Sequence, residues 1–352
     1  MTRKLLIANR GEIAVRIARA AADLDIATVA VHPADDERAL HTRVADQAVA
    51  LEGRGAAAYL DAEQLVRVAV ETGCDAVHPG YGFLSESRDF AERCQQAGLT
   101  FVGPTPEVLA LLGDKARARV LAEECQVPVV PGTGADTTLE QARAFRDGLG
   151  ADATVIVKAI AGGGGRGMRI VRPGDDLAEA FKRCQAEAEA AFGNGALYVE
   201  RFIDRARHIE VQVVGDGGET PVHLWERECS LQRRNQKLVE IAPAPTLSDA
   251  TRQKLLDAAL RLASRVGYRS LGTFEFLVDA DESRFAFIEA NPRLQVEHTV
   301  TEEVTGVDLV QTQLRIAGGA SLADLGLSRD TVPAPAGFAV QLRINMETMD
   351  AS

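Results

Sequence analysis

Short apolar runs alternate with helically spaced apolar positions in the first third of the chain. The run at residues 5–8 predicts a buried strand. Beyond it, apolar side chains recur at the spacing of a helix face, namely Ile13, Ile17, Ala21 and Leu24. Further short strands are expected at residues 28–31, 75–77 and 100–102. Strand–helix–strand alternation is typical of a parallel, doubly wound α/β sheet.

A proline- and glycine-rich break at residues 128–134 indicates entry into a second unit. Beyond the break, two strands flank a glycine loop, followed by a helix at about 176–191 and a strand at 197–200. A third segment begins with the alternating run 208–214, which predicts a half-buried strand. It continues through a helix near 249–266 to two strands that carry Glu275 and Glu289.

Those two glutamates sit in a predicted hairpin. The strands 273–277 and 284–289 flank a turn-like segment, and a hairpin symmetric about Glu282 places Glu275 opposite Glu289 on one face. Two facing carboxylates repel each other unless a cation lies between them. The pattern therefore predicts a divalent cation site. The alternative, two exposed edge carboxylates, is disfavoured by the aromatic neighbours of both residues.

The segment 289–298 concentrates polar groups directly after an apolar strand. Glu289 and Asn291 offer hard oxygen ligands of the kind that Mg²⁺ prefers, and Arg293 offers a planar fork for an oxyanion. Such groups at a strand end indicate a functional site, because burying them costs free energy unless they are paired. A solvated strand-to-loop transition is the structural alternative.

The glycine loop after Lys158 satisfies the pattern G-x-G-x-x-G through Gly162, Gly164 and Gly167. A strand follows it, however, where a dinucleotide-binding turn requires a helix. No such motif follows the first strand either, so a dinucleotide fingerprint is absent there. Glycines let backbone N–H groups approach a polyphosphate closely, and Lys158 adds a compact positive charge. The alternative is a mobile surface hairpin without a ligand.

The charged run 226–237 follows a predicted strand at 222–225, and its composition favours a solvated loop. Cys229 within it is expected to be a small packed side chain, since no partner pattern for a nucleophile accompanies it.

Composition narrows the class of protein. The chain has 352 residues, 46% of them hydrophobic and 26% charged, which is typical of a globular protein of two or three domains. A net charge of −12 without a long Lys/Arg run argues against nucleic-acid binding. Five separated cysteines predict reduced thiols in a cytoplasm-like compartment. We expect neither a signal peptide nor a membrane span.

These motifs together resemble the biotin carboxylase family of ATP-grasp ligases, nearly from end to end. The matching segments are 7–14, 78–86, 113–115, the glycine loop, 232–237, 272–276, 293–298 and 341–345. The resemblance implies an α/β fold that is α+β in the ATP-grasp part. It implies a Rossmann-like N-terminal domain at 1–113 and an ATP-grasp domain at 114–317 with a lid lobe at 131–203. The start of a C-terminal domain would occupy 318–352, and we expect this last domain to be incomplete.

The resemblance also implies the site residues. Those that would bind ATP are Lys115, Lys158, Gly164, Gly165, Met168, Glu200, Arg201, Phe202, Ile203, His208, Gln232, Asn235, Glu275 and Glu289. Glu275, Glu289 and Asn291 would carry Mg²⁺ or Mn²⁺, with two ions per site. Lys237, Arg293, Gln295 and Val296 would bind bicarbonate, Glu297 would act as general base, and Arg343 would stabilise the biotin enolate. Asn235 departs from the family, in which many members have histidine.

The implied activity is ATP-dependent carboxylation of biotin on a biotin carboxyl carrier protein, as the first half-reaction of an acyl-CoA carboxylase. The implied partners are that carrier, a carboxyltransferase and a second copy of the chain, to which Arg16 and Arg19 would contribute. Two alternatives are another ATP-grasp ligase, forming carbamoyl phosphate or a carboxylate–amine bond, and an ATP-binding homologue without turnover. Segment 293–298 with Lys237 favours the biotin group.

Overall fold

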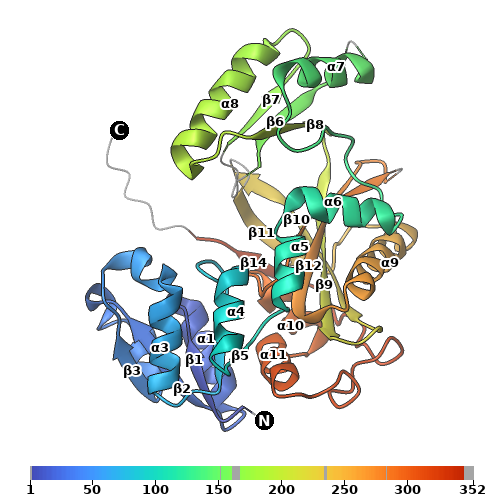
Figure 1. Cartoon of the computed structure of the whole chain (residues 1–352). Coiled ribbons are helices and arrows are strands. Elements are labelled where there is room, and N and C mark those ends of the chain that lie inside the picture. Colours follow the sequence, from blue (N-terminus) through green and yellow to red (C-terminus); the bar gives the residue numbers. More distant parts are fainter. Residues whose placement is uncertain (1, 151, 161–166, 234–235, 283, 345–352) are drawn as a thin grey trace.

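Three β-sheets with their covering helices organise the chain (Figure 1). The computed structural model describes residues 2–150, 152–160, 167–233, 236–282 and 284–344. The segments follow the order expected from the sequence, and the doubly wound α/β prediction is confirmed, with antiparallel sheets following the parallel one.

The first sheet is parallel, with strand order β3-β2-β1-β4-β5. Its strands are β1 (Lys4–Ile7), β2 (Ala27–His32), β3 (Gln47–Ala50), β4 (Ala76–His78) and β5 (Thr100–Phe101). Helices α1 (Gly11–Ala22), α3 (Ala62–Glu71) and α4 (Arg88–Gln96) connect them. Between β1 and β4 the strand order reverses, which is where ligands usually bind in such sheets. There Asn9 donates hydrogen bonds to the carbonyls of Pro79 (2.6 Å) and Tyr81 (2.8 Å), fixing the loop that leads to Glu86.

A smaller lobe, at the top of Figure 1, contains the antiparallel sheet β7-β6-β8. It is built from β6 (Val155–Ala159), β7 (Met168–Val171), β8 (Leu197–Arg201), α7 (Leu139–Leu149) and α8 (Leu177–Phe192). Alternation in β6 directs Val155, Val157 and Ala159 into the core beneath the two helices. Lys158 therefore lies on the opposite face. The predicted strand–loop–strand arrangement is confirmed, and residues 161–166 of the loop lie outside the described residues.

The third sheet has six strands in the order β13-β12-β9-β10-β11-β14. They are β9 (Arg207–Asp216), β10 (Val222–Arg233), β11 (Gln236–Ala242), β12 (Arg269–Val278), β13 (Phe285–Asn291) and β14 (Ala339–Leu342). Glu275 is the register partner of Glu289, as the hairpin symmetry predicts.

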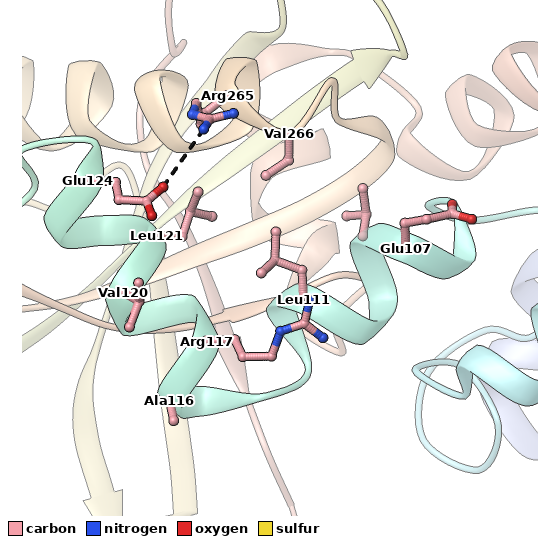
Figure 2. Close-up of a pocket in the computed structure, with 10 residues that line it drawn as sticks. Glu107, Leu111, Ala116, Arg117, Val120, Leu121, Glu124, Arg265 and Val266 are labelled. Atoms are coloured by element: carbon pink, nitrogen blue, oxygen red, sulfur yellow. Dashed lines mark ion pairs between the residues drawn. The ribbon is translucent and has the colours of Figure 1, made fainter. Parts of the chain in front are cut away.

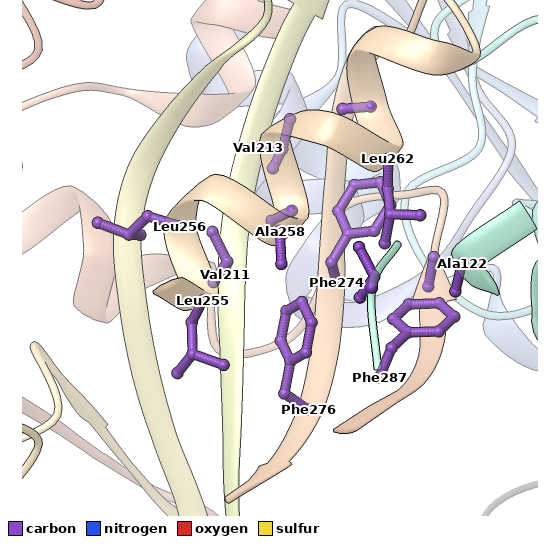
Figure 3. Close-up of a cluster of buried hydrophobic side chains, with 14 of the residues drawn as sticks. Ala122, Val211, Val213, Leu255, Leu256, Ala258, Leu262, Phe274, Phe276 and Phe287 are labelled. Carbon is purple, nitrogen blue, oxygen red and sulfur yellow. The ribbon is translucent and has the colours of Figure 1, made fainter. Parts of the chain in front are cut away.

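One face of this sheet forms the largest hydrophobic core, against α9 (Asp249–Arg265). Figure 3 shows Phe274, Phe276 and Phe287 packed beside Leu255 and Ala258 of the helix. The alternating strand β9 contributes its apolar positions, 209, 211 and 213, to this core. Its polar positions, 208, 210 and 212, consequently point to the other face of the sheet. The packing of the core thus determines on which face a polar site can form.

The remaining helical elements complete the framework. They are α2 (Leu40–Val44), α5 (Pro106–Leu112), α6 (Lys115–Glu124), α10 (His298–Thr305), α11 (Leu309–Ala317) and the 3-10 turns η1 (Ala34–Asp36) and η2 (Gly55–Leu60). An open cavity of about 490 Å³ lies between α5, α6 and the end of α9, and the Glu124–Arg265 ion pair (3.8 Å) closes one side of it (Figure 2). Across the described part of the chain, no helix is both long and apolar enough to cross a membrane.

The prediction of a solvated loop at residues 226–237 is wrong over much of this run. Strand β10 continues to Arg233, and Glu226, Arg227, Glu228 and Cys229 are buried within it. A register shift between His223 and Glu226 interrupts the alternation. Arg227 then faces the polar side, whereas Glu226 pairs with Arg252 at the start of α9 (2.8 Å). Charged side chains can be buried here because partners on other elements neutralise them.

Candidate active site

A row of charged side chains crosses the polar face of the six-stranded sheet. Arg227 of β10 is the register partner of Glu210 on β9, and Glu210 is in turn the partner of Glu275 on β12. Glu275 is the partner of Glu289 on β13. Carboxylates that face each other on adjacent strands destabilise a sheet unless cations compensate them. The arrangement therefore requires positive charge from other residues.

Lys237 of β11 supplies that charge at the centre of the row. Its Nζ lies 2.6 Å from Glu210 Oε2, 3.0 Å from Glu275 Oε1 and 2.8 Å from Glu297 Oε1. The three carboxylates come from β9, β12 and the residue that precedes α10. An ammonium group has three donors, and all three are engaged here.

Each of these three carboxylates also has a second cationic or imidazole partner. Glu210 Oε1 lies 2.5 Å from Arg227 Nε. Glu275 Oε2 lies 2.5 Å from His208 Nε2, whose Nδ1 is 2.9 Å from Gln232 Nε2. Glu297 Oε2 lies 2.9 Å from Arg343 Nη2, which follows β14. The result is one continuous network of ion pairs.

Charge pairing determines the protonation of this network. Burial raises the pKa of Glu297, but Lys237, Arg227 and Arg343 outweigh it and lower the pKa to about 2. Burial likewise opposes ionisation of Glu275, and Lys237 and His208 hold its pKa well below the usual value. Burial lowers the pKa of Lys237, yet the surrounding carboxylates raise it well above its ordinary value. Glu297, Glu275 and the ammonium of Lys237 are therefore charged near neutral pH.

The edge of the network lies towards the parallel sheet. Arg293 donates from Nε to Glu86 Oε1 (2.6 Å) and from Nη2 to Asn291 Oδ1 (3.0 Å). Asn291 Nδ2 and Gln295 Nε2 both donate to Glu275 Oε1, at 2.7 and 3.1 Å. Val296 is half-buried between Gln295 and Glu297. The 289–298 segment thus joins the loop at the end of β4 to the central carboxylates.

Three further ion pairs occupy the region between the six-stranded sheet and the lobe. Lys115, the first residue of α6, lies 3.0 Å from Glu289 Oε2. In the lobe, Glu200 binds Lys158 and Arg119, both at 2.6 Å. Met168 is the register partner of Lys158.

The polypeptide leaves the lobe at the end of β8. Arg201 is exposed there, and Phe202 and Ile203 are half-buried. All three line a cavity of about 1000 Å³ that also contacts Leu277 and Phe285.

Most of the expected residues lie on this network or beside it. Lys237, Glu297, Arg343, Glu275, His208, Gln232, Asn291, Gln295 and Arg293 are directly connected. Glu289 with Lys115, and Glu200 with Lys158, form separate pairs. Gly164, Gly165 and Asn235 lie outside the described residues.

Sequence reasoning missed several members of the site. Glu210 and Arg227 are completely buried at its centre, and Glu240, also buried, binds Arg343 at 2.5 Å. Glu86 and Arg119 hold Arg293 and Glu200. A signal for Glu210 was available, because the alternation of 208–214 places His208, Glu210 and Gln212 on one face. Arg227 gave no such signal, because the register shift interrupts its strand.

Oxygen donors suitable for a hard divalent cation gather around Glu275. Glu275, Glu289 and Asn291 offer carboxylate and amide oxygens, and one nitrogen or oxygen each of His208, Glu210 and Glu275 lie within 4.8 Å of one another. His208 and Lys115 neutralise Glu275 and Glu289 at these positions. The donor set fits Mg²⁺ or Mn²⁺, because a cation could take over the compensation that these side chains provide.

Comparisons with known proteins place this geometry in a family. Residues 1–109 match the family model "Biotin carboxylase, N-terminal domain", and residues 114–325 match "Carbamoyl-phosphate synthase L chain, ATP binding domain". Pyruvate carboxylase 1 of Caenorhabditis elegans is 53% identical over 348 residues, which are 98% of this chain and 29% of that protein. This chain therefore spans less than a third of that relative.

This chain spans a larger share of the similar solved structures than it does of that pyruvate carboxylase. The biotin carboxylase domain of 2-oxoglutarate carboxylase from Hydrogenobacter thermophilus, in complex with MgADP, ADP and bicarbonate, superposes with a TM-score of 0.92 at 43% identity. The match covers 97% of this chain and 74% of that one. The biotin carboxylase of Campylobacter jejuni gives a TM-score of 0.92 at 40% identity, over 97% and 76% of the two chains.

The two family models together separate a biotin carboxylase from a carbamoyl-phosphate-forming ligase. The ATP-binding model is shared with carbamoyl-phosphate synthases, so it alone leaves a carbamoyl-phosphate-forming enzyme possible. The N-terminal model and the whole-chain similarity to biotin carboxylase structures distinguish the two groups. The chain belongs to the biotin carboxylase family.

Proposed function

We propose that this chain carboxylates biotin, held on a biotin carboxyl carrier protein or domain, with ATP and bicarbonate. The observation that carries the proposal is Lys237, whose ammonium touches Glu297 while Arg343 binds the other oxygen of the same carboxylate. A general base between two cations suits a reaction in which an anionic substrate must be bound and deprotonated.

Bicarbonate would bind to Lys237 and Arg293, beside Gln295 and Val296. Glu297, with its pKa of about 2, is ionised but weakly basic while Lys237 contacts it. A bicarbonate ion bound to Lys237 competes for the same ammonium and so raises the basicity of Glu297. Substrate binding thus activates the base that removes the bicarbonate proton.

ATP would lie between the lobe and the six-stranded sheet. Lys115 and Lys158 would contact its phosphates, with the glycine loop, including Gly164 and Gly165, over them. The segment Glu200–Ile203 would hold the adenine, with Met168, His208, Gln232 and Asn235 nearby. Lys115 and Lys158 are each paired with a glutamate, so phosphate oxygens would replace carboxylates that already neutralise these cations.

Glu275, Glu289 and Asn291 would hold Mg²⁺ or Mn²⁺, two ions per site. The metal would neutralise charge on the phosphates of ATP. Within this chain, His208 and Lys115 must then release the carboxylates that they pair with.

The proposed chemical steps are those that the resemblance to biotin carboxylases implies. A bicarbonate oxygen attacks the γ-phosphorus of ATP, ADP leaves, and Glu297 accepts the bicarbonate proton, which yields carboxyphosphate. Carboxyphosphate decomposes to CO₂ and phosphate. The phosphate accepts the N1 proton of biotin, and N1 then attacks CO₂ to form carboxybiotin. Arg343 stabilises the enolate oxygen of biotin after Arg343 has released its own hydrogen bond to Glu297.

A carboxyltransferase outside this chain would choose the final acceptor. The acceptor stays open, as it does from the sequence, because a pyruvate carboxylase, a 2-oxoglutarate carboxylase and a long-chain acyl-CoA carboxylase are all similar to this chain. A homodimer and a cytoplasmic location remain proposals. Arg16, expected at a dimer contact, binds Glu302 (2.9 Å) and Asp308 (2.8 Å) of its own chain, whereas Arg19 is exposed.

ADP release from MgATP tests the proposal, with bicarbonate and free biotin added or omitted in turn. We expect turnover that requires bicarbonate, rises with biotin and falls by roughly 100-fold or more in Glu297→Gln. Turnover that ignores biotin but responds to ammonia or an amine would favour a different ATP-grasp ligase. Tight ATP binding without turnover would favour the non-catalytic alternative.

A further inference from the structure

Arg227 lies behind the reactive face of the candidate site and is completely buried. Its guanidinium has five N–H donors, and five hydrogen bonds use them. Nε binds Glu210 (2.5 Å), Nη1 binds Gln212 (2.9 Å) and Thr301 (2.8 Å), and Nη2 binds Thr273 (3.2 Å) and Gln295 (3.0 Å). No bond remains for a substrate, so Arg227 cannot contact the reacting atoms directly.

Three partners of Arg227 lead to the residues proposed to act on bicarbonate. Glu210 touches the ammonium of Lys237 (2.6 Å), and Gln295 is itself proposed to lie beside bicarbonate. Thr301 belongs to α10, the helix whose N-cap residue is Glu297. Arg227 therefore links two strands, the 289–298 segment and α10 at a single point.

We propose that Arg227 is a positioning residue for bicarbonate activation, one that fixes Lys237 and Glu297 relative to each other through Glu210, Gln295 and α10. The inference rests on the proposed function and deepens it. A planar fork of five donors suits this task, because a lysine in its place has three donors and no fixed plane. Misplacement of reacting groups by about 1 Å can lower a rate by roughly 100-fold.

The opposite face of the same strand offers a control. Glu226, next to Arg227 in sequence, is also completely buried, and it pairs with Arg252 Nε at 2.8 Å. Arg252 further donates to Asp249 and to the carbonyl of Ala244. This pair faces the start of α9 and touches none of the proposed site residues. Both arginines stabilise the fold, but the proposal gives only Arg227 a role in the reaction.

The electrostatic surroundings of Glu297 give a second readout. The charged and titratable groups that face it are Lys237 and Glu240 of β11, Arg227 and Cys229 of β10, Glu210 of β9, Arg343 and Tyr81. Burial raises the pKa of Glu297, and Lys237, then Arg227, lower it. Removal of the Arg227 charge therefore moves this pKa upward. The change should be visible in the acid limb of kcat at saturating bicarbonate, because kcat reports the complex in which bicarbonate has already raised the basicity of Glu297.

Bicarbonate-dependent ADP release would be measured for the wild type, Arg227→Met, Arg227→Lys and Arg252→Met. In Arg227→Met we expect the KM for bicarbonate to rise about tenfold or more and the KM for ATP to change less than about threefold. The acid limb of kcat at saturating bicarbonate should move to higher pH. Arg227→Lys should show a smaller change in the same direction, and it carries the test if Arg227→Met does not fold.

Arg252→Met should lower the melting temperature yet leave the KM for bicarbonate and the acid limb in place. If the wild type is active and both Arg227 variants keep its KM for bicarbonate and its acid limb, the inference is overturned while the proposed function stands. The same shift in Arg252→Met would also overturn it, because a general loss of stability would then explain the effect. A wild type without bicarbonate-dependent turnover would overturn the proposed function and the inference together.

Discussion

Replacement of Lys237 by methionine tests the charge network most directly. Methionine keeps an unbranched side chain of similar length but removes the ammonium. Glu210, Glu275 and Glu297 then lose a cation that lies 2.6 to 3.0 Å from each of them. At an effective dielectric constant of about 20, each contact at that distance is worth roughly 6 kcal/mol of Coulomb attraction.

The net loss is smaller than the sum of those contacts. The methionine avoids the desolvation of a buried ammonium, which costs several kcal/mol. Each carboxylate also keeps its second partner, which is Arg227 for Glu210, His208 for Glu275 and Arg343 for Glu297. We therefore expect a loss of about 3–5 kcal/mol at pH 8, the usual cost of breaking a buried ion pair.

The pH dependence follows from the sign of the pKa shifts. A carboxylate whose pKa is lowered on folding contributes stability that is present above its unfolded pKa and is lost as the pH falls through its folded pKa. In the wild type, Glu297 shifts from 4.5 to about 2, so its contribution persists at pH 5. Without Lys237 the folded pKa values of Glu297 and Glu275 rise, and protonation at pH 5 relieves their repulsion. The destabilisation should thus be smaller at pH 5 than at pH 8.

Urea unfolding followed by tryptophan fluorescence measures the effect. The chain has one tryptophan, Trp225, on β10, where its Nε1 donates to the carbonyl of Pro333 (2.7 Å). Lys254→Met, an exposed lysine on α9, is the control and should change stability by less than about 0.5 kcal/mol. A loss below about 1 kcal/mol in Lys237→Met, equal at the two pH values, would refute the reasoning.

Two further predictions concern the core and the cation site. Phe276→Ala should lower the free energy of unfolding in urea by about 3–5 kcal/mol, since its buried ring packs against Phe287 (5.9 Å between centroids). Val120→Ala, at a side chain that is 54% exposed, should cost less than about 1 kcal/mol. Glu289→Gln should raise the Mg²⁺ concentration needed for half-maximal ADP release by roughly tenfold, because a neutral amide is a poorer ligand. An unchanged Mg²⁺ requirement would show that Glu289, which pairs with Lys115, does not hold the metal.

Sequence patterns identified the elements of this fold where periodicity is regular. The helices predicted at 176–191 and 249–266 are Leu177–Phe192 and Asp249–Arg265 in the structure. The pairing of Glu275 with Glu289 is confirmed, although the pairs nearer the turn, such as Phe276 with Phe287, are centred half a residue earlier, and a register shift between Glu275 and Phe276 brings the two glutamates opposite each other. These features depend on neighbours a few residues apart, which a single sequence displays.

The charged half of β10 could not be predicted in the same way. Trp225 adopts a positive φ of 66°, and the register shifts between His223 and Glu226. The partners that allow Arg227 to be buried lie as far away as Thr301, 74 residues along the chain. A run of charged residues looks like an exposed segment when the charges that compensate it are remote in sequence. Whether such residues are buried is therefore decided by tertiary contacts.

The same pairing bears on how the proposed site would accept anions in a protein with a net charge of −12. Lys237, Lys115 and Lys158 are each neutralised by carboxylates of the site, so their charge attracts no ligand from a distance. A phosphate or bicarbonate oxygen can pair with one of these lysines only by displacing the carboxylate that is already paired with it. Binding is then an exchange of partners, with a small net gain for each contact and a strong dependence on geometry. Such a site favours a ligand that can replace several carboxylates together, which is the property expected where ATP, bicarbonate and a divalent cation bind side by side.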